Sequence, residues 1–342
     1  MRVRPAFRPY FFEILALAHV VILWAIMRRA GINFGLAHVS VWFPGFMLTL
    51  AIACAAGVGL RLLRGRIRND RRYLHRIRSA EWLLLTARMI VIAALSTILY
   101  GWLKLLVPVL NPVSYDGALW EIDRALLLGH SPNVLFLEVF RVPWLLRFVD
   151  WSYGVLFLVA LYLVKGFFLS YPSSRVRVAF ANGYLLLWIV GAWLYLLVPS
   201  MGPAYRFPDV WAEVSPWFEM TRAGQRALLL NYLEVGKLAR GESAKIILVY
   251  GIAAFPSLHV GFQMFAALWM RKLSPVMALA FDLLVVWILF GSVVTGWHYL
   301  IDGLAGIALA YVCYRAGLRI TPMTRKTGSP RTPRRPDNPR SR

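Results

Sequence analysis

The sequence predicts an all-α protein, a polytopic bundle of transmembrane helices with about eight spans. Of its 342 residues, 59% are hydrophobic and only 16% are charged, whereas a soluble domain carries about 25% charged residues. The apolar residues form several runs of about 20, the length that a helix needs to cross a bilayer. Arg and Lys residues cluster between and beyond these runs.

The apolar runs define the expected order of the elements. The eight predicted spans cover approximately residues 11–27, 41–60, 82–107, 150–170, 178–198, 253–270, 274–295 and 299–316. The first run imitates a signal peptide, but it ends in Met27-Arg28-Arg29 rather than in a small-residue cleavage site, so we predict an uncleaved span. We divide the chain into two N-terminal spans with a basic loop (1–80), a six-span core (81–316) and a disordered basic tail (317–342).

The net charge of +22 raises the alternative of a nucleic-acid partner, with residues 61–78 as a basic arm. That stretch is tethered between two spans, and Tyr73 is its only aromatic residue, so lipid headgroups are the favoured partner. Basic residues between spans also follow the positive-inside pattern of membrane proteins. We therefore expect contact with membrane lipids and no nucleic acid.

Two short motifs hold the residues with the clearest chemistry. They are Phe255-Pro256-Ser257-Leu258-His259 and His298-Tyr299-Leu300-Ile301-Asp302. His298 and Asp302 are four residues apart, so a helix places them on one face, where the carboxylate can fix the imidazole tautomer and raise its basicity. Pro256 and Ser257 are typical of a helix start, whose free N–H groups favour an anion. Together these features suggest phosphoryl transfer.

Each histidine alone is more typical of a polar anchor at a membrane interface, but both motifs open a span on the same side, which favours a shared site. A metal site needs three or more converging ligands. His259, His298 and Asp302 could nominally provide them, but no spare carboxylate lies nearby in the sequence. We therefore expect neither a metal nor a cofactor.

The basic residues also predict an orientation. With the N-terminus inside, residues 61–78 are cytoplasmic, whereas the long segments 108–149 and 199–252 and both histidine motifs are outside. The preference for Arg over Lys favours a bacterial genome rich in GC. We expect an integral protein of the bacterial inner membrane with its active site on the extracytoplasmic face.

The two outer segments carry further signals. Residues Leu119, Ile122 and Leu126 have helical spacing, as expected of an interfacial helix, which we interpret as a lid or packing element rather than a catalytic one. The second segment opens with a turn-rich stretch, 199–207, that could return Arg206 to the membrane surface.

The two histidine motifs resemble the second and third motifs of the type 2 phosphatidic acid phosphatase superfamily. The His-Tyr-x-x-Asp form is most similar to the inositol phosphorylceramide synthase branch, which also resembles sphingomyelin synthases. Residues 115–123 and 202–205 resemble outer-loop segments of that branch. The similarity covers roughly residues 100–316, so the family's six-helix core would correspond to spans three to eight.

This resemblance implies a role for each site residue. His298 would be the nucleophile that takes the phosphoryl group as a phosphohistidine, with Asp302 as its orienting partner. His259 would protonate the leaving oxygen and then activate the acceptor. The chemistry is sound, because an imidazole nucleophile divides one displacement into two easier steps and a second histidine can serve both proton transfers.

Two departures from the family concern the phosphate. The first motif, Lys-x6-Arg-Pro, is not found, and Ser292 stands where an Arg is expected six residues before His298. Cations contribute much to phosphoryl transfer, so we assign phosphate binding to Arg206 and to the backbone around Ser257, with other Lys or Arg residues of the loops as alternatives. Arg206 could instead anchor its loop to headgroups, and Ser257 could only cap its helix.

The sequence thus predicts a membrane-embedded enzyme that transfers phosphoryl groups of lipid phosphates or phospholipid headgroups. An alcohol acceptor such as ceramide, which we favour, would make it a phosphotransferase of the inositol phosphorylceramide synthase type. Water as acceptor would make it a lipid phosphate phosphatase, and a non-catalytic lipid transporter or scaffold is a third possibility. We also expect Arg88 and Asp282, two ionisable residues within spans, to pair with each other.

Overall fold

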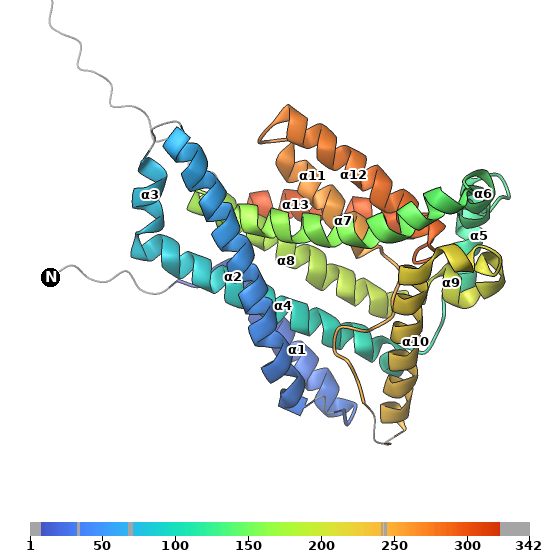
Figure 1. The fold of residues 1–342 in the computed structure, drawn as a ribbon. Coiled ribbons are helices and arrows are strands. Elements are labelled where there is room, and N and C mark those ends of the chain that lie inside the picture. The colour runs from blue at the N-terminus through green and yellow to red at the C-terminus, as the bar shows by residue number, and fades with distance from the viewer. Residues whose placement is uncertain (1–7, 33–34, 68–70, 241, 243–244, 322–342) are drawn as a thin grey trace, which may run out of the picture.

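The computed structural model describes residues 8–32, 35–67, 71–240, 242 and 245–321, in which all regular secondary structure is helical, without a strand (Figure 1). The long helices are α1 (Phe11–Arg29), α2 (Gly35–Ile67), α4 (Ala80–Leu110), α7 (Pro143–Leu169), α8 (Ser174–Leu197), α10 (Glu219–Ala239), α12 (Pro275–Val294) and α13 (Leu300–Ile320). The shorter helices are α3 (Arg72–Ile77), α5 (Asp116–Leu126), α6 (Pro132–Val139), α9 (Pro203–Arg206), η1 (Pro208–Trp211), η2 (Ser215–Trp217) and α11 (Leu258–Met270). The predicted all-α fold is confirmed.

Seven of the described helices are long and apolar enough to cross a membrane, namely α1, α2, α4, α7, α8, α12 and α13. The eighth predicted span, 253–270, contains the shorter apolar helix α11. Its first residues are not helical, because Pro256 has no N–H to donate and disfavours helical geometry at Phe255. The chain is therefore a polytopic membrane protein whose short helix α11 lies inside the bundle.

Helix α11 is the centre of the hydrophobic core. It packs against α12 and α13, and α13 in turn packs against α8 (Figure 1). Large buried side chains of three helices meet here, among them Phe168 of α7, Phe180 of α8 and Phe265 of α11. The helix has 13 residues, or about 20 Å at 1.5 Å per residue, so it is shorter than the roughly 30 Å of hydrocarbon in a bilayer. The loop before it consequently enters the bundle.

Helices α1 and α2 pack on the outside of α4, α7 and α8. The contact between α2 and α7 is close, because a Cβ built at Gly166 of α7 would lie 2.3 Å from the carbonyl oxygen of Ala53 of α2. Phe12 and Leu50 join Leu185 of α8 in one buried cluster. The two N-terminal helices therefore share a core with the predicted six-span unit, and the proposed domain division remains a prediction.

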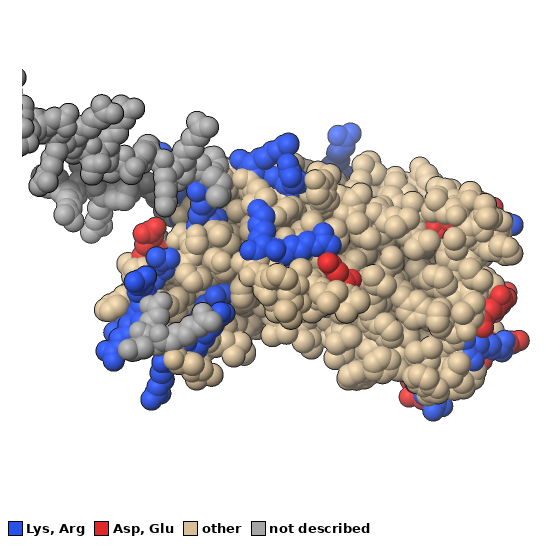
Figure 2. Space-filling model, turned by 90° about the horizontal axis from the view of Figure 1, so that it is seen from above, with Lys and Arg blue, Asp and Glu red and all other residues tan. Residues whose placement is uncertain are grey.

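The two ends of the bundle differ. We call the end that carries α3 and the α7–α8 turn the basic end, and the end that carries α5, α6 and α9 the histidine end (Figure 1). On the face shown in Figure 2, Lys and Arg gather towards one side, and the remaining surface is almost entirely uncharged up to a mixed rim of acidic and basic side chains. Exposed apolar side chains such as Leu17, Leu163 and Val312 cover the helices between the ends, as a lipid-facing surface requires.

The predicted pair of Arg88 and Asp282 is wrong. Arg88 forms an ion pair with Glu13 of α1, and Asp282 lies 2.8 Å from Arg271. The reason lies in the packing, since α4 contacts α1, α2 and α8 whereas α12 contacts α7 and α11. The charge within a span is paired in both cases, Arg88 with a residue of α1 and Asp282 with the residue that ends α11.

The helix predicted from the spacing of Leu119, Ile122 and Leu126 is present as α5. In α5, Leu119 is buried while Ile122 and Leu126 are exposed. Helix α10 lies across the bundle at the histidine end and packs against α4 and α7 (Figure 1). At the C-terminus α13 continues to Ile320, so the predicted tail begins later than expected, and the rest of that tail lies outside the described residues.

Candidate active site

His259 is the second residue of α11 and is held by the cap of that helix. The Ser257 hydroxyl accepts a hydrogen bond from the N–H of Val260 (3.4 Å), which satisfies one of the free donors of the first turn. The N–H of Ser257 donates to the backbone carbonyl of Asp302 (2.8 Å). This bond joins the start of α11 to the start of α13, so the two histidine motifs are fastened together by their backbones.

His298 lies in the short loop between α12 and α13. Its N–H donates to the carbonyl of Ser292 (3.1 Å), and the amide of Asn133 in α6 donates to the carbonyls of Val293 (2.7 Å) and His298 (3.2 Å). Asn133 is fully buried. A side chain from a distant helix therefore fixes the position of the histidine loop.

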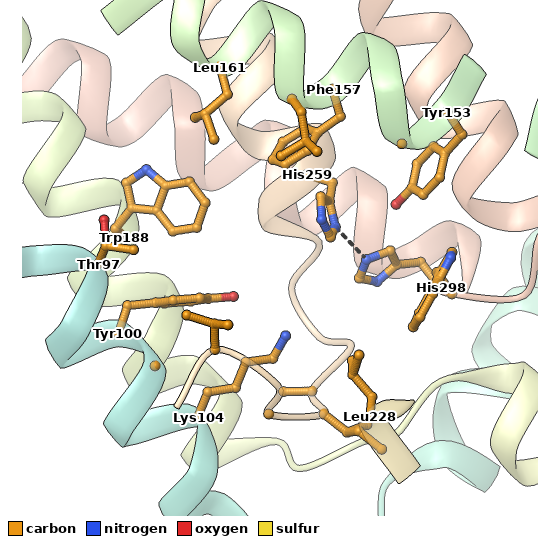
Figure 3. Close-up of a pocket in the computed structure, with 18 of the residues that line it drawn as sticks. Thr97, Tyr100, Lys104, Tyr153, Phe157, Leu161, Trp188, Leu228, His259 and His298 are labelled. Atoms are coloured by element: carbon orange, nitrogen blue, oxygen red, sulfur yellow. Dashed lines mark hydrogen bonds between the residues drawn. The ribbon is translucent and has the colours of Figure 1, made fainter. Parts of the chain in front are cut away.

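The two histidines and the aspartate form one chain of contacts. His259 Nδ1 lies 3.4 Å from His298 Nε2 (Figure 3), and His298 Nδ1 lies 3.3 Å from Asp302 Oδ2. The same carboxylate oxygen accepts a hydrogen bond from the N–H of Tyr299 (3.0 Å). A carboxylate acceptor favours the tautomer of His298 with its proton on Nδ1. Nε2 then carries a free lone pair that faces His259.

The environment of His298 keeps its imidazole neutral. Burial lowers the pKa of His298 to about 3, with the positive charge of Lys104 acting in the same direction and a hydrogen bond to the Ala254 backbone opposing it. The ordinary pKa of histidine is about 6.5. At neutral pH the lone pair on Nε2 is therefore available for nucleophilic attack.

Both histidines line a cavity of about 520 Å³. Figure 3 shows them together with Lys104, Tyr100 and Trp188, which come from α4 and α8 and point into the same space. Lys104 and the two histidines are polar groups at its histidine end, and most of the other walls are apolar or aromatic, including Phe46, Phe157, Leu161, Trp188 and Leu228. An apolar cavity with a few convergent polar groups is the usual form of a small-molecule site.

Lys104 is a cation beside the histidines in this cavity that the sequence analysis missed. Its Nζ lies 5.8 Å from the ring centre of Tyr100 and 5.5 Å from that of Tyr195, and no carboxylate within the described part of the chain forms an ion pair with it. A signal existed in the sequence. Lys104 precedes Asn111-Pro112 by the spacing of Lys-x6-Arg-Pro, with Asn in place of Arg.

Asn111 shows why only half of that motif is recognisable. Its amide donates to the carbonyl of Leu196 (2.9 Å), so it joins α4 to α8, and it does not line the cavity. Lys104, at the lysine position of the motif, thus lies beside the histidines, whereas Asn111, at the arginine position, joins two helices.

The two residues predicted to bind phosphate lie elsewhere. Arg206 is exposed at the end of α9, with its guanidinium 5.7 Å from the ring centre of Phe207, and it does not line the cavity. Ser257 is fully buried as the N-cap of α11. The structure brings His259, His298 and Asp302 together but places Arg206 apart from them, and the phosphate-binding role of both residues remains a prediction.

Two buried carboxylates of α5 hold the loops around the site. Asp116 accepts hydrogen bonds from the N–H groups of Met201 and Gly202 and from the hydroxyl of Tyr299, each at 2.9 Å. Asp123 accepts from the N–H groups of Leu300 (2.6 Å) and Ile301 (2.8 Å) at the start of α13. Helix α5 is therefore a packing element, as predicted, and it fixes the residues next to His298.

Gly202 lets the second outer segment approach the histidine loop. Its φ is +107°, and a Cβ there would lie 2.6 Å from the carbonyl oxygen of Trp297. Glycine is the residue that tolerates both conditions. No group of three or more His, Cys, Asp or Glu side chains within the described ranges could hold a metal ion.

Comparisons with known proteins add a family to this geometry. A search of curated proteins and a search of solved structures each found no match. The family model of the PAP2 superfamily matches residues 117–316, more than half of the chain, and this segment includes both histidine motifs and Asp302 but not Lys104. The chain therefore belongs to the PAP2 superfamily, the type 2 phosphatidic acid phosphatases and their relatives, whose members act on phosphate esters.

Proposed function

We propose that this protein is a lipid phosphotransferase that works through a phosphohistidine on His298. The chain of contacts from His259 through His298 to Asp302, at the polar end of a largely apolar cavity, carries the proposal. In the scheme Asp302 holds the Nδ1 proton of His298, which leaves Nε2 as the nucleophile. His259 handles the protons of the leaving and accepting groups.

The first step forms the enzyme intermediate. His298 Nε2 attacks the phosphorus atom of the lipid, a bond forms between nitrogen and phosphorus, and the bond from phosphorus to the leaving oxygen breaks. His259, protonated once the negative phosphate has entered beside it, gives its proton to that oxygen. The products of this step are an alcohol and a phosphoryl group, or a substituted phosphoryl group, on His298.

The second step returns the enzyme to its starting state. A hydroxyl group of the acceptor attacks phosphorus while its proton passes to His259, and the bond between phosphorus and Nε2 breaks. Lys104 is the cation best placed to balance the phosphate charge in both steps, because it lines the cavity beside the histidines whereas Arg206 does not. The scheme uses no metal ion and no cofactor.

The apolar walls support a lipid substrate, and the His-Tyr-x-x-Asp motif supports the inositol phosphorylceramide synthase type of transfer. In such a transfer the donor is a phospholipid and the acceptor is the hydroxyl of ceramide. The basic loops support a cytoplasmic basic end and an extracytoplasmic histidine end, in a bacterial inner membrane. Hydrolysis is the second candidate function, because water could enter the same site as acceptor.

The test uses purified protein in lipid vesicles that contain either phosphatidic acid or phosphatidylinositol labelled in the phosphate, with and without ceramide, in the presence of EDTA. A labelled ceramide product is expected with phosphatidylinositol, which supports the transferase. Free labelled phosphate or inositol phosphate without ceramide would instead support the phosphatase.

Matched variants make the result specific to the site. His298→Ala should remove the labelled products, whereas His130→Ala, which changes an exposed histidine outside the cavity, should retain them. Vanadate, which mimics the five-coordinate phosphoryl state, should inhibit the wild-type protein. Products that persist in His298→Ala, or a need for added metal, would contradict the scheme, and no turnover of either lipid would favour a transporter or scaffold.

A further inference from the structure

Lys165 is a buried amine inside a membrane-spanning helix. It lies near the end of the predicted span 150–170, and in α7 its side chain is only 8% exposed. Its Nζ lies 5.2 Å from the ring centre of Tyr162 and 5.4 Å from that of Tyr184. Across the residues that the structure describes, no Asp or Glu forms an ion pair with it.

Lys165 lines the same cavity as the catalytic histidines. The α7 residues that line it include Tyr153, Phe157, Leu161 and Lys165, which are spaced by four and so follow one face of the helix. The ring centre of Phe157 is 4.3 Å from that of His259. Lys165 is eight residues further along α7, or about 12 Å at 1.5 Å per residue. The cavity therefore has a second polar end, towards the basic end of the bundle.

The walls between these two ends are mostly apolar or aromatic, and the hydroxyls of Ser96 and Thr97, which also line the cavity, donate to the carbonyl of Ala93 in their own helix. Helix α2 contributes Phe46 and Leu50, α7 contributes Leu161, and α8 contributes Trp188. A smaller cavity of about 30 Å³ continues past Lys165, shares Leu50 and Tyr184 with the main one, and is otherwise lined by apolar side chains. A chain of methylene groups fits such walls, whereas a second headgroup does not.

A lysine amine within a bilayer carries its charge at a high free-energy cost unless an anion pairs with it. At this site the described chain offers aromatic rings but no anion, while the cavity offers room for one. We propose that the Lys165 end of the cavity is a second ligand subsite, which binds a carboxylate carried on a long apolar chain. The chain extends along α7 towards the histidines.

The charge at the subsite favours a carboxylate over a phosphate monoester. A single ammonium group balances one negative charge, and a buried phosphate dianion would keep an unpaired charge at high cost. Lys104, at the other end, is the cation next to the histidines. The carboxylate can belong to a free fatty acid or to a lipid whose acyl chain ends in a carboxyl group.

This inference does not rest on the proposed phosphoryl transfer, and its test measures binding. The first arm compares labelled palmitic acid with hexadecanol of equal chain length, bound to the purified full-length protein in one detergent at pH 8. The second arm compares two lysophosphatidic acids, one with an acyl chain that ends in a carboxylate and one with a methyl end. In at least one arm we expect the carboxylate ligand to bind at least tenfold more tightly.

Variants assign the preference to the lysine. Lys165→Met and Lys165→Gln should abolish the preference, whereas Lys272→Met, which changes an exposed lysine outside the cavity, should keep it. His298→Ala should also keep it, so a failure of the phosphoryl-transfer scheme would not be confused with a failure of this one. A preference in the first arm identifies a fatty acid, and one in the second arm alone identifies a carboxyl-ended lipid.

Two results would overturn the proposal. One is equal binding of the acid and the neutral ligand by the wild-type protein in both arms. The other is an unchanged preference in both Lys165 variants, each shown by thermal melting to be folded.

Discussion

His298 lies between a carboxylate that holds one ring nitrogen and a second imidazole that faces the other. In the proposed scheme the two histidines have different tasks, so their removal should differ in kind. His259→Ala should lower turnover by roughly 10²–10⁴ through loss of proton transfer. His298→Ala should abolish turnover because no nucleophile remains.

Trapping of the intermediate separates these two effects. Brief incubation with phosphate-labelled lipid, followed by alkaline denaturation, should leave acid-labile label on the wild-type protein and none on His298→Ala. Label on the His298→Ala protein would place the phosphoryl group on another residue and contradict the assignment.

Lys104 acts on His298 through its charge, in addition to the phosphate role that we propose for it. Its positive charge and burial both lower the pKa of His298, so the wild-type acid limb of kcat/KM should lie below pH 6.5, since neutral His298 is required. Loss of the charge in Lys104→Met should raise that pKa and move the acid limb to higher pH. The pH profile on a short-chain phosphate ester measures the shift, with Lys104→Arg as the charge-retaining control.

The lysine variants also test the structural alternative. If Lys104 only packed against Tyr100 and Tyr195, Lys104→Met would keep the wild-type pH profile at reduced stability. An unmoved acid limb in the folded variant would therefore count against this role.

At the residue scale the sequence singled out His259, His298 and Asp302 because they lie in two contiguous motifs, and the structure brings these three side chains together, while their proton-handling roles remain a prediction. The sequence did not predict Lys104. In the motif Lys-x6-Arg-Pro the arginine position is Asn111 here, and without the arginine the lysine is not recognised. It also could not predict that Asp302 and Ser257 meet through their backbones. That contact depends on how two helices dock, and no local spacing encodes it.

Asp123 belongs to one helix but stabilises another. It accepts hydrogen bonds from Leu300 and Ile301, two of the N–H groups that the first turn of α13 cannot satisfy internally. Asp123→Ala should leave these buried donors without a partner and lower the free energy of unfolding by roughly 1–3 kcal/mol. Thermal melting in detergent measures the loss, and exposed Asp209→Ala is the control.

The same carboxylate predicts a dependence on pH. Burial raises the pKa of Asp123 to about 6, and the two N–H donors offset only part of this effect. Because the pKa of Asp123 is higher in the folded state than its unfolded value of about 3.9, the contribution of Asp123 to the free energy of unfolding falls as pH rises between these two values. Asp123→Asn should remove that part of the slope of stability against pH, and an unchanged slope would contradict the shift.

The contact between α2 and α7 depends on the absence of a side chain. A methyl group at Gly166 would meet the backbone of α2 at 2.3 Å, whereas Gly59, on α2, has nothing within 4 Å. Gly166→Ala should therefore force the helices apart and destabilise the protein by about 1–3 kcal/mol. Gly59→Ala should be neutral or stabilising, because alanine is the better helix former. Equal melting temperatures for the two variants would refute this account of the contact.

At the scale of elements, the eight apolar runs correspond to the observed helices because hydropathy over about 20 residues is a strong signal. The sequence analysis was wrong where the result depends on which helices pack against each other. Lys165 lies within the predicted span 150–170, but hydropathy does not show whether its amine reaches water, and the packing of α7 buries it. Arg88 was paired with Asp282 because both are ionisable residues within spans, but that does not show which helices touch.

The whole molecule has chemically different ends, and this predicts its orientation in the membrane. His130 and Lys272 are exposed, on the histidine side and on the turn between α11 and α12 respectively, and both native cysteines are buried. A membrane-impermeant maleimide should label His130→Cys in intact spheroplasts and Lys272→Cys only after permeabilisation. The unsubstituted protein gives the background, and the opposite pattern would reverse the proposed topology.

The cavity is lined by residues from two parts of the chain, one inside and one outside the segment that matches the superfamily. The histidines and the α7 face lie within residues 117–316, whereas Phe46, Leu50 and Lys104 come from α2 and α4 and precede that segment. The segment 117–316 therefore supplies the two histidines but only part of the cavity wall. Evolution could exchange the N-terminal helices between relatives and retune ligand choice while the reaction is kept. Protein engineers could use the same junction, before residue 117, to build chimeras with new lipid preferences.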